Sequence, residues 1–289
     1  MIEIIIHIFK GLKERIIIIF NMNNSDYLLN IKTIQASTIK MVIDAMKEIL
    51  MDVNLEFDDT GMKIIALDNT HIVLIHLKLE AEKFERYYCE KKLYVGINML
   101  KFHMLIKTIT NSDILSLFIL KSDPNILGIT IENGERNVKT TYRLSMLDID
   151  VVNVDIPPQD FNTIITMPSS YLQKIIRDMH NLAEFIEIKN ENDKLILSCQ
   201  GEFCCQETIL GTEKSQNINM RKNNEMIVEG AKEVIQGVFS LKYLSIFTKC
   251  TNLSSSVEIY LKNAYPIILQ YSIASMGTVR LCLAQKNED

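Results

Sequence analysis

The chain contains no tryptophan, and its 289 residues include only 5 prolines, 10 glycines and 6 cysteines. Cysteines this sparse are too few for a disulfide scaffold and fit a reducing, intracellular compartment. No apolar run reaches the roughly 20 residues that a membrane helix needs, because Lys10 and the charged residues 13–15 divide the apolar stretches near the N-terminus. We therefore expect neither a signal peptide nor a membrane anchor, and no membrane partner.

An excess of positive charge is also missing. Lys and Arg number 31 against 36 Asp and Glu, which gives a formal net charge of -5. A protein that reads a DNA groove usually gains its affinity by neutralising many phosphates, and an acidic chain cannot do so over its whole surface. Any contact with DNA must therefore be local.

Local catalytic motifs are absent as well. The sequence has no Gly-rich phosphate loop, no Ser-His-Asp or Cys-His neighbourhood and no Cys-x-x-Cys pair. His71 and His76 lie an odd number of positions apart in an expected strand, so they would point to opposite faces, which disfavours a shared metal. We expect no catalytic residue, no metal and no cofactor. An enzyme whose site is assembled from distant residues is the alternative.

What the chain does have is an apolar fraction of 47%, which is ample for two domains. Residues 100–107 and 241–250 open with the same Leu-Lys-aromatic pattern, displaced by 141 positions (242 minus 101). A repeat at about half the chain length predicts a duplicated unit. Apolar periodicity predicts two helices in each unit among many short strands, at residues 37–50, 99–107, 170–182 and 241–250.

Basic residues recur on the predicted helices, opposite the apolar stripes. In the first helix, Lys40 and Lys47 lie within about 20° of each other, and Asp44 between them is a candidate for a surface ion pair. Each cation taken alone is most simply a solvated surface charge, but their recurrence on four helices predicts a shared basic surface. Its members are Lys40, Lys47, Lys101, Lys107, Lys174, Arg177, Lys242 and Lys249.

Composition suggests four segments. Residues 1–26 form an N-terminal extension, either sequence upstream of a true start at Met22 or an amphipathic appendage for a membrane surface or a partner. Residues 27–143 form the first domain and residues 161–289 the second. Residues 144–160 are apolar and acidic, contain no basic residue and include two prolines near their end, so they are predicted to connect the domains and to pack against them.

Four stretches carry a family resemblance, and in chain order they are LDNTHIVLIHL, YVGIN, VDIPPQDF and LKYLSIFTK. Together with the duplication, they make residues 27–289 resemble the proliferating cell nuclear antigen family of DNA sliding clamps. The resemblance implies an α+β DNA clamp fold, with two topologically similar domains that each place antiparallel sheets outside and two helices inside, and that form a ring. It also implies a processivity factor for a DNA polymerase, located in the nucleus or in a cytoplasmic viral replication factory.

The resemblance further implies partners and residue roles. A head-to-tail homotrimer would be placed around double-stranded DNA by an ATP-driven clamp loader, and the basic residues above would line its hole without reading sequence. Client proteins with a Gln-x-x-aliphatic-x-x-aromatic-aromatic peptide would dock in a groove. The groove would comprise Leu67, His71, Ile72, Val154, Ile156, Pro157, Phe161, Pro266 and Ala284. The subunit interface would pair one chain's edge strand, with Val138, Thr140 and Tyr142, with a strand of the next chain that carries Leu195, Leu197 and Cys199.

Five positions depart from the family pattern, among them Asn287, where the family usually has Ile, and Asn192, which occupies the position of the lysine that eukaryotic clamps use for ubiquitin. Met41 and Met104 stand where family members usually carry basic residues, so the hole is expected to be less positive. Gln285 replaces a proline at the far edge of the groove. Two rival functions use the same fold: a viral processivity factor that does not close a ring, and a checkpoint-type clamp subunit that pairs only with different chains.

Overall fold

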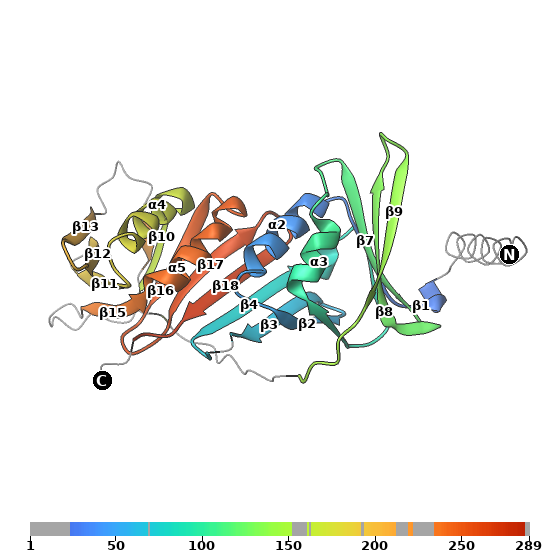
Figure 1. The fold of residues 1–289 in the computed structure, drawn as a ribbon, viewed down its shortest axis with the longest axis horizontal. Helices are drawn as coiled ribbons and strands as arrows, with labels where there is room; N and C mark the ends of the chain where they lie inside the picture. Colours follow the sequence, from blue (N-terminus) through green and yellow to red (C-terminus); the bar gives the residue numbers. More distant parts are fainter. Residues whose placement is uncertain are drawn as a thin grey trace, which may run out of the picture.

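A computed structural model describes residues 24–68, 70–151, 161, 163–191, 194–211, 219–221 and 234–286. Among these residues, nine strands and two α-helices occur in one order and then occur again in the same order (Figure 1). The predicted duplication is therefore a property of the fold. Val154, Ile156 and Pro157 of the expected groove lie outside the described residues, as does almost all of the N-terminal extension.

The first unit follows a short 3-10 helix, η1 (Asn24–Asp26), and contains a second one, η2 (Ala81–Lys83). Its elements are β1 (Tyr27–Thr33), α2 (Ala36–Met46), β2 (Asp52–Asp58), β3 (Gly61–Leu67), β4 (Val73–Glu80), β5 (Arg86–Cys89), β6 (Leu93–Asn98), α3 (Met99–Ile106), β7 (Asp113–Leu120), β8 (Asp123–Asn133) and β9 (Val138–Ser145).

The second unit repeats this series, with a 3-10 helix, η3 (Thr248–Asn252), after its second helix. Its elements are β10 (Thr163–Pro168), α4 (Ser169–His180), β11 (Phe185–Glu191), β12 (Lys194–Gln200), β13 (Cys205–Gly211), β14 (Asn219–Arg221), β15 (Ile235–Ser240), α5 (Leu241–Phe247), β16 (Ser256–Leu261), β17 (Ile267–Ile273) and β18 (Gly277–Leu283).

The sheets show how the two units join. Each unit builds one five-stranded and one four-stranded antiparallel block, and the central nine-stranded sheet has the order β14-β10-β16-β17-β18-β4-β3-β2-β6. Its first five strands correspond to the separate sheet β5-β1-β7-β8-β9, and its last four correspond to the separate sheet β13-β12-β11-β15. The units are joined by the β18–β4 pair, from Gly277↔Leu79 to Leu283↔Val73. Two edges of the end sheets, β9 and β13, therefore have no partner strand among the described residues.

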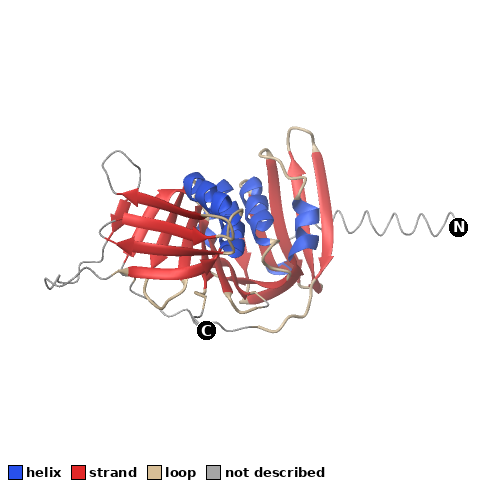
Figure 2. Cartoon of the chain, turned by 60° about the vertical axis from the view of Figure 1, so that its left-hand side comes forward, coloured by secondary structure: helices blue, strands red, loops and turns tan. Residues whose placement is uncertain are grey.

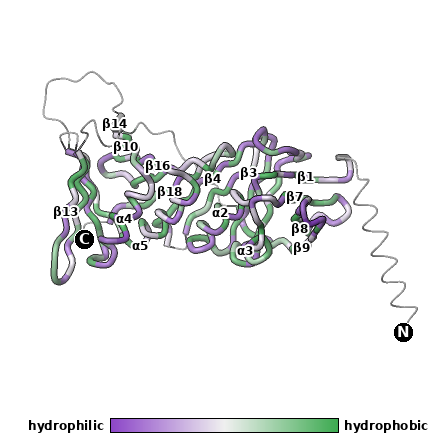
Figure 3. The backbone as a smooth tube through the Cα atoms, turned by 90° about the horizontal axis from the view of Figure 1, so that it is seen from above, coloured by the Kyte–Doolittle hydropathy of each residue, from purple (hydrophilic) through white to green (hydrophobic). Residues whose placement is uncertain are grey.

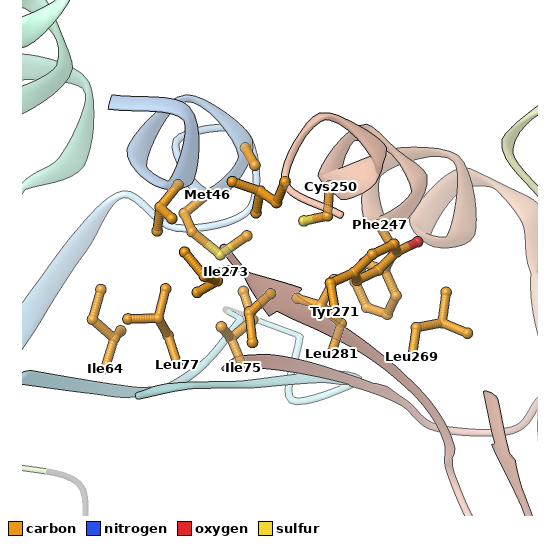
Figure 4. Close-up of a cluster of buried hydrophobic side chains, with 14 of the residues drawn as sticks. Met46, Ile64, Ile75, Leu77, Phe247, Cys250, Leu269, Tyr271, Ile273 and Leu281 are labelled. Carbon is orange, nitrogen blue, oxygen red and sulfur yellow. The ribbon is translucent and has the colours of Figure 1, made fainter. Parts of the chain in front are cut away.

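The helices lie together on one side of the sheets (Figures 1 and 2). Contacts link α4 to α5, η3 to α2 and α2 to α3, so these elements form a continuous row, called here the helix row. Below it, alternate residues of β4 are fully buried because a strand presents every second side chain to the same face. In Figure 4, Met46 from the first unit and Phe247 from the second lie above Ile75 and Leu281 of the shared sheet. The hydrophobic core therefore continues across the domain boundary.

Hydropathy follows this architecture. Hydrophobic stretches recur along the strands of both units, and hydrophilic stretches along the loops that join them (Figure 3).

The helices α3 and α5 correspond with a displacement of 142 rather than the predicted 141. Buried Met99 and Phe102 match buried Leu241 and Leu244 (241 minus 99), and the N-cap positions Asn98 and Ser240 match as well.

Three predicted element boundaries were wrong. The first helix ends at Met46 instead of residue 50. The last helix ends at Phe247 instead of residue 250, so Lys249 belongs to η3. His71 is not part of a strand; it has a left-handed backbone with φ of 57° in the turn before β4. This turn has a local cause, because the carboxylate of Asp68 accepts hydrogen bonds from backbone N–H groups within it.

Candidate DNA-facing surface and partner groove

All eight predicted cations lie on the helix row. The apolar faces of its helices are buried against the sheets, so their polar faces point away from the sheets. Six of the cations are exposed, and the two on α2 are half-buried. The structure therefore gathers these charges from both domains on a single side of the molecule.

The two α2 lysines are the least available for a ligand. Lys40 Nζ donates a hydrogen bond to the backbone carbonyl of Ile109, at 2.8 Å, and Lys47 Nζ forms an ion pair with Asp44. Both side chains are half-buried and bonded to other groups of the protein, so their charges are only partly available to a ligand. The predicted ion pair between Asp44 and Lys47 is thus present, and it reduces the positive character of α2.

Acidic residues on the helix row hold other cations. Lys249 in η3 forms an ion pair with Glu48, which follows α2, so this contact crosses the domain boundary. Arg177 Nε lies 3.7 Å from Asp178 Oδ1, although the Arg177 side chain is still 68% exposed. Sequence alone does not assign Glu48 or Asp178 to this surface, because their pairing depends on the helix arrangement or on a neighbouring side chain's rotamer.

His103 joins α3 to α2. Its Nε2 lies 3.0 Å from Asp44 Oδ1. Burial and the nearby Lys47 charge lower the pKa of His103, so the ring is neutral at pH 7. The hydrogen bond from Lys47 lowers the pKa of Asp44 and keeps this carboxylate ionised. This cluster is a fixed polar link between two helices and adds no positive charge at neutral pH.

Four cations make no ion pair with any described residue: Lys101, Lys107, Lys174 and Lys242. Lys242 Nζ instead lies 5.6 Å from the centroid of the Tyr243 ring. Apolar side chains share this surface, since Met104 is 54% exposed and Met41 is exposed too. The available charge is therefore concentrated on α3, α4 and α5, and α2 contributes little.

The groove expected for partner peptides begins at the turn after β3. Asp68 Oδ1 accepts hydrogen bonds from the backbone N–H groups of Ile72 and Val73, at 2.9 and 2.8 Å. Burial would raise the pKa of Asp68, but hydrogen bonds from Thr70, Val73 and Ile72 outweigh it and lower the pKa. The ionised carboxylate thus fixes a turn that presents His71 and Ile72, both exposed.

The second domain supplies the other side of this groove. Ala284 N–H donates to the carbonyl of Ile72 at 3.0 Å, directly across the domain boundary. Ala284 also lines a hollow of 960 Å³ with Pro266 and Tyr265, and Leu67 and His71 line another of 720 Å³. The structure therefore brings Leu67, His71, Ile72 and Ala284 together, with Pro266 beyond them.

Phe161 lies against the same end of the second domain. Its ring centroid is 5.3 Å from Tyr260 and 5.7 Å from Tyr265, both with edge-on geometry. At the far edge, Gln285 Nε2 donates to the Tyr265 carbonyl at 3.0 Å. The side chain that departs from the family pattern is thus held against the rim of the hollow.

The expected subunit interface requires a correction. Thr140 and Val138 lie on β9, which is an edge strand, and Val138 is 52% exposed; Tyr142 on the same strand is half-buried. However, Leu195, Leu197 and Cys199 lie on β12, which pairs with β11 on one side and β13 on the other. All three point into the core and are buried. They cannot form the edge of a sheet, and the free edge on that side is β13.

Three further features of the described part of the chain concern metal binding, membrane helices and reactive thiols. It has no group of three or more His, Cys, Asp or Glu residues able to hold a metal, and none of its helices is long and apolar enough to cross a membrane. Burial raises the pKa of the Cys250 thiol to about 12 and that of Cys282 to about 11. These thiols are protonated at neutral pH and pack as small hydrophobic groups.

Comparison with known proteins agrees with this architecture. Residues 28–154 match the family profile for the N-terminal domain of proliferating cell nuclear antigen, and residues 155–286 match that for its C-terminal domain. The chain belongs to the proliferating cell nuclear antigen family. Its α+β clamp fold and its function as a sliding clamp and processivity factor follow from this membership.

Two relatives in the family cover nearly the same length. The chain is 38% identical over 267 residues to the probable DNA polymerase sliding clamp 1 of Paramecium bursaria Chlorella virus 1, covering 91% of this chain and 98% of the viral one. It is 33% identical over 262 residues to proliferating cell nuclear antigen of Chaetomium thermophilum, covering 91% and 99%. Clamps of the proliferating cell nuclear antigen family are scaffolds without catalytic activity.

Proposed function

We propose that three copies of this clamp close head to tail into a ring around double-stranded DNA. The observation that carries the proposal is the topology of the central sheet, in which β18 of one domain pairs with β4 of the other. The counterpart of β18 in the first unit is β9, and the counterpart of β4 in the second unit is β13. Pairing β9 of one copy with β13 of the next would rebuild the same nine-stranded sheet and cover two open edges.

In such a ring the helix row would face the hole. Its exposed cations, chiefly Lys107, Lys174, Arg177 and Lys242, would contact phosphates through water and without base recognition. Closure of the ring would retain the DNA, so weak contacts would be sufficient and would permit sliding. This arrangement reconciles DNA association with a net charge of -5.

The groove would recruit clients to the ring. A peptide with an aliphatic anchor and two aromatic anchors would place them against Ile72, Leu67 and the hollow beside Ala284, as a short helical turn. A DNA polymerase and other replication or repair proteins would dock there in turn, and an ATP-driven clamp loader would place the ring on DNA. The expected location is the site of DNA replication, in a nucleus or a cytoplasmic viral factory.

Closure on DNA can be tested with a circular template. The clamp, with its loader, is placed on nicked circular DNA, and the bound protein is measured before and after the circle is cut once. We expect a mass of three chains in solution, retention on the circle and rapid loss from the cut DNA. Continued binding to linear DNA would favour a processivity factor that does not form a ring, and failure to self-assemble would favour a subunit that pairs with different chains.

The groove can be tested with the substitution Ile72→Asp. A charge in an apolar pocket costs roughly 2 kcal/mol or more, so we expect a peptide with the Gln-x-x-aliphatic-x-x-aromatic-aromatic pattern to bind at least about tenfold more weakly. Fluorescence anisotropy of a labelled peptide provides the measurement. Met51→Asp, at another exposed apolar residue, is the matched control. Equal affinity of the Ile72 variant and the wild type would place the peptide elsewhere.

A further inference from the structure

The boundary between the two domains includes a side-chain contact outside the shared sheet. The hydroxyl of Tyr243, on α5, lies 3.2 Å from Thr70 Oγ1 and 3.4 Å from Asp68 Oδ2. Helix α5 of the second domain thus touches the loop that follows β3 in the first domain. Since the ring would repeat this boundary between copies, the corresponding residues indicate what meets there.

The internal repeat identifies those residues. The displacement of 142 between α3 and α5 makes Lys101 the counterpart of Tyr243 (243 minus 142). Strands β3 and β12 correspond with a displacement of 133, because buried Met62 and Ile64 match buried Leu195 and Leu197. The loop after β3 therefore corresponds to residues 201–204 after β12.

Lys101 and this loop carry matching chemistry. Lys101 is exposed and makes no ion pair with a described residue; Glu202, the only charged residue of the 201–204 loop, is also exposed. Beside it, Phe203 is 79% exposed, more than any other large hydrophobic residue among those described. Within the part of the chain that the structure describes, the Lys101 cation of the first domain and the Glu202 carboxylate and Phe203 ring of the second domain are thus left without partners.

The direction of Lys101 agrees with this assignment. Two residues along an α-helix correspond to a rotation of about 200°, so Lys101 points to nearly the opposite side of α3 from His103. His103 contacts Asp44 on α2. Lys101 therefore points away from α2, toward the open end of the helix row.

We propose that Lys101 of one copy forms an ion pair with Glu202 of the next copy, with Phe203 packed beside the lysine stem. This proposal depends on the proposed ring and assigns Lys101 to the boundary between copies rather than to the DNA. A lysine stem has enough apolar length to cover an aromatic ring while its ammonium group reaches a carboxylate. The partner that fits this surface is thus a second copy of the same chain.

Lys107, unlike Lys101, would find no carboxylate partner at the boundary between copies. Its counterpart by the same displacement is Lys249 (249 minus 142), which pairs with Glu48 inside the chain. The counterpart of Glu48 is Asn181 (48 plus 133), because buried Val42 and Met46 of α2 match buried Ile175 and Met179 of α4. Asn181 would thus offer an amide rather than a carboxylate to Lys107 of the neighbouring copy. The ammonium group of Lys107 would therefore stay available for DNA.

A charge swap tests the contact. Lys101→Glu and Glu202→Lys are made separately and together, and the concentration at which the assembly half-dissociates is measured by mass photometry or sedimentation. An exposed ion pair is a weak contact, and a like-charge pair opposes association by a similar amount, so we expect each single change to raise that concentration about tenfold. The double variant should return to within about threefold of the wild type, because the pair is restored in reverse.

Other outcomes separate this proposal from the ring itself. A wild type that does not self-assemble would overturn the ring. A trimeric wild type whose single variants assemble normally, or whose double variant is not restored, would overturn only the Lys101–Glu202 contact. Lys107→Glu is the matched comparison, expected to shorten retention on DNA without changing assembly. The same behaviour from Lys101→Glu would return Lys101 to the DNA-facing surface.

Discussion

Lys174→Glu combined with Arg177→Glu is expected to shorten the lifetime of the loaded ring on circular DNA by about tenfold or more at moderate salt. Both side chains are exposed on α4, and neither has a carboxylate partner closer than 3.7 Å among the described residues. Reversal in three copies would place six negative charges beside the phosphates. Retention is measured as the decay of clamp bound to closed circles, and processivity as the length of primer extension with the loader and polymerase present.

The control for this variant carries the same charge change on the other side of the sheets. Lys78 on β4 and Lys189 on β11 alternate with buried neighbours, so both lie on the sheet face opposite the helices. Lys78→Glu with Lys189→Glu should retain near-normal lifetimes. Because all four sites are at least partly exposed, the melting temperatures should change little. Equal lifetimes for both double variants would show that α4 does not face DNA.

Val138→Asp combined with Ile209→Asp is expected to convert the assembly largely to single chains at micromolar concentration. These residues lie on the free edges β9 and β13, and each is 52% exposed in the single chain. Charged side chains on an edge strand oppose pairing with another strand. We expect at least a tenfold rise in the concentration needed for assembly, equivalent to about 1.4 kcal/mol or more. Sedimentation across a concentration series measures it.

Folding must be preserved for this result to be informative. Both positions are solvent-exposed in the isolated chain, so circular dichroism should show an intact fold in the double variant. Met51→Asp is the matched control, since Met51 is an exposed hydrophobic residue in the loop between α2 and β2. Should the double variant still assemble as three chains at low concentration, the copies would have to join through surfaces other than β9 and β13.

Helix periodicity predicted which cations lie on the polar side of the helix row, for a physical reason. A helix that buries one stripe must expose the opposite stripe, so Lys174 and Arg177 could be placed from spacing alone. The Asp44–Lys47 pair was also predictable, because residues three apart on a helix are neighbours. The hydrogen bond from Lys40 to the Ile109 carbonyl was not, since it depends on where the segment after α3 crosses α2.

Strand order was beyond the reach of local sequence. The strand expected to carry Leu195, Leu197 and Cys199 exists as β12 (Lys194–Gln200). Alternation reports which face of a strand is buried but not which strand lies next to it, so the local sequence could not test the edge position that the family resemblance implied for β12. The turn at His71 was missed because the apolar run that begins at Ile72 leads directly into β4, whereas the Asp68 carboxylate fixes a turn there through its own hydrogen bonds.

The ion pair between Lys249 and Glu48 strengthens the junction between the two domains of one chain. It crosses the junction inside each chain, where covalent continuity and the β18–β4 ladder also resist separation. In the proposed ring, the matching position at each boundary between copies would carry Asn181 in place of a carboxylate, and no peptide bond would span that boundary. We therefore expect the ring to open between two copies, with the two domains of each chain moving together, and DNA to enter through that opening.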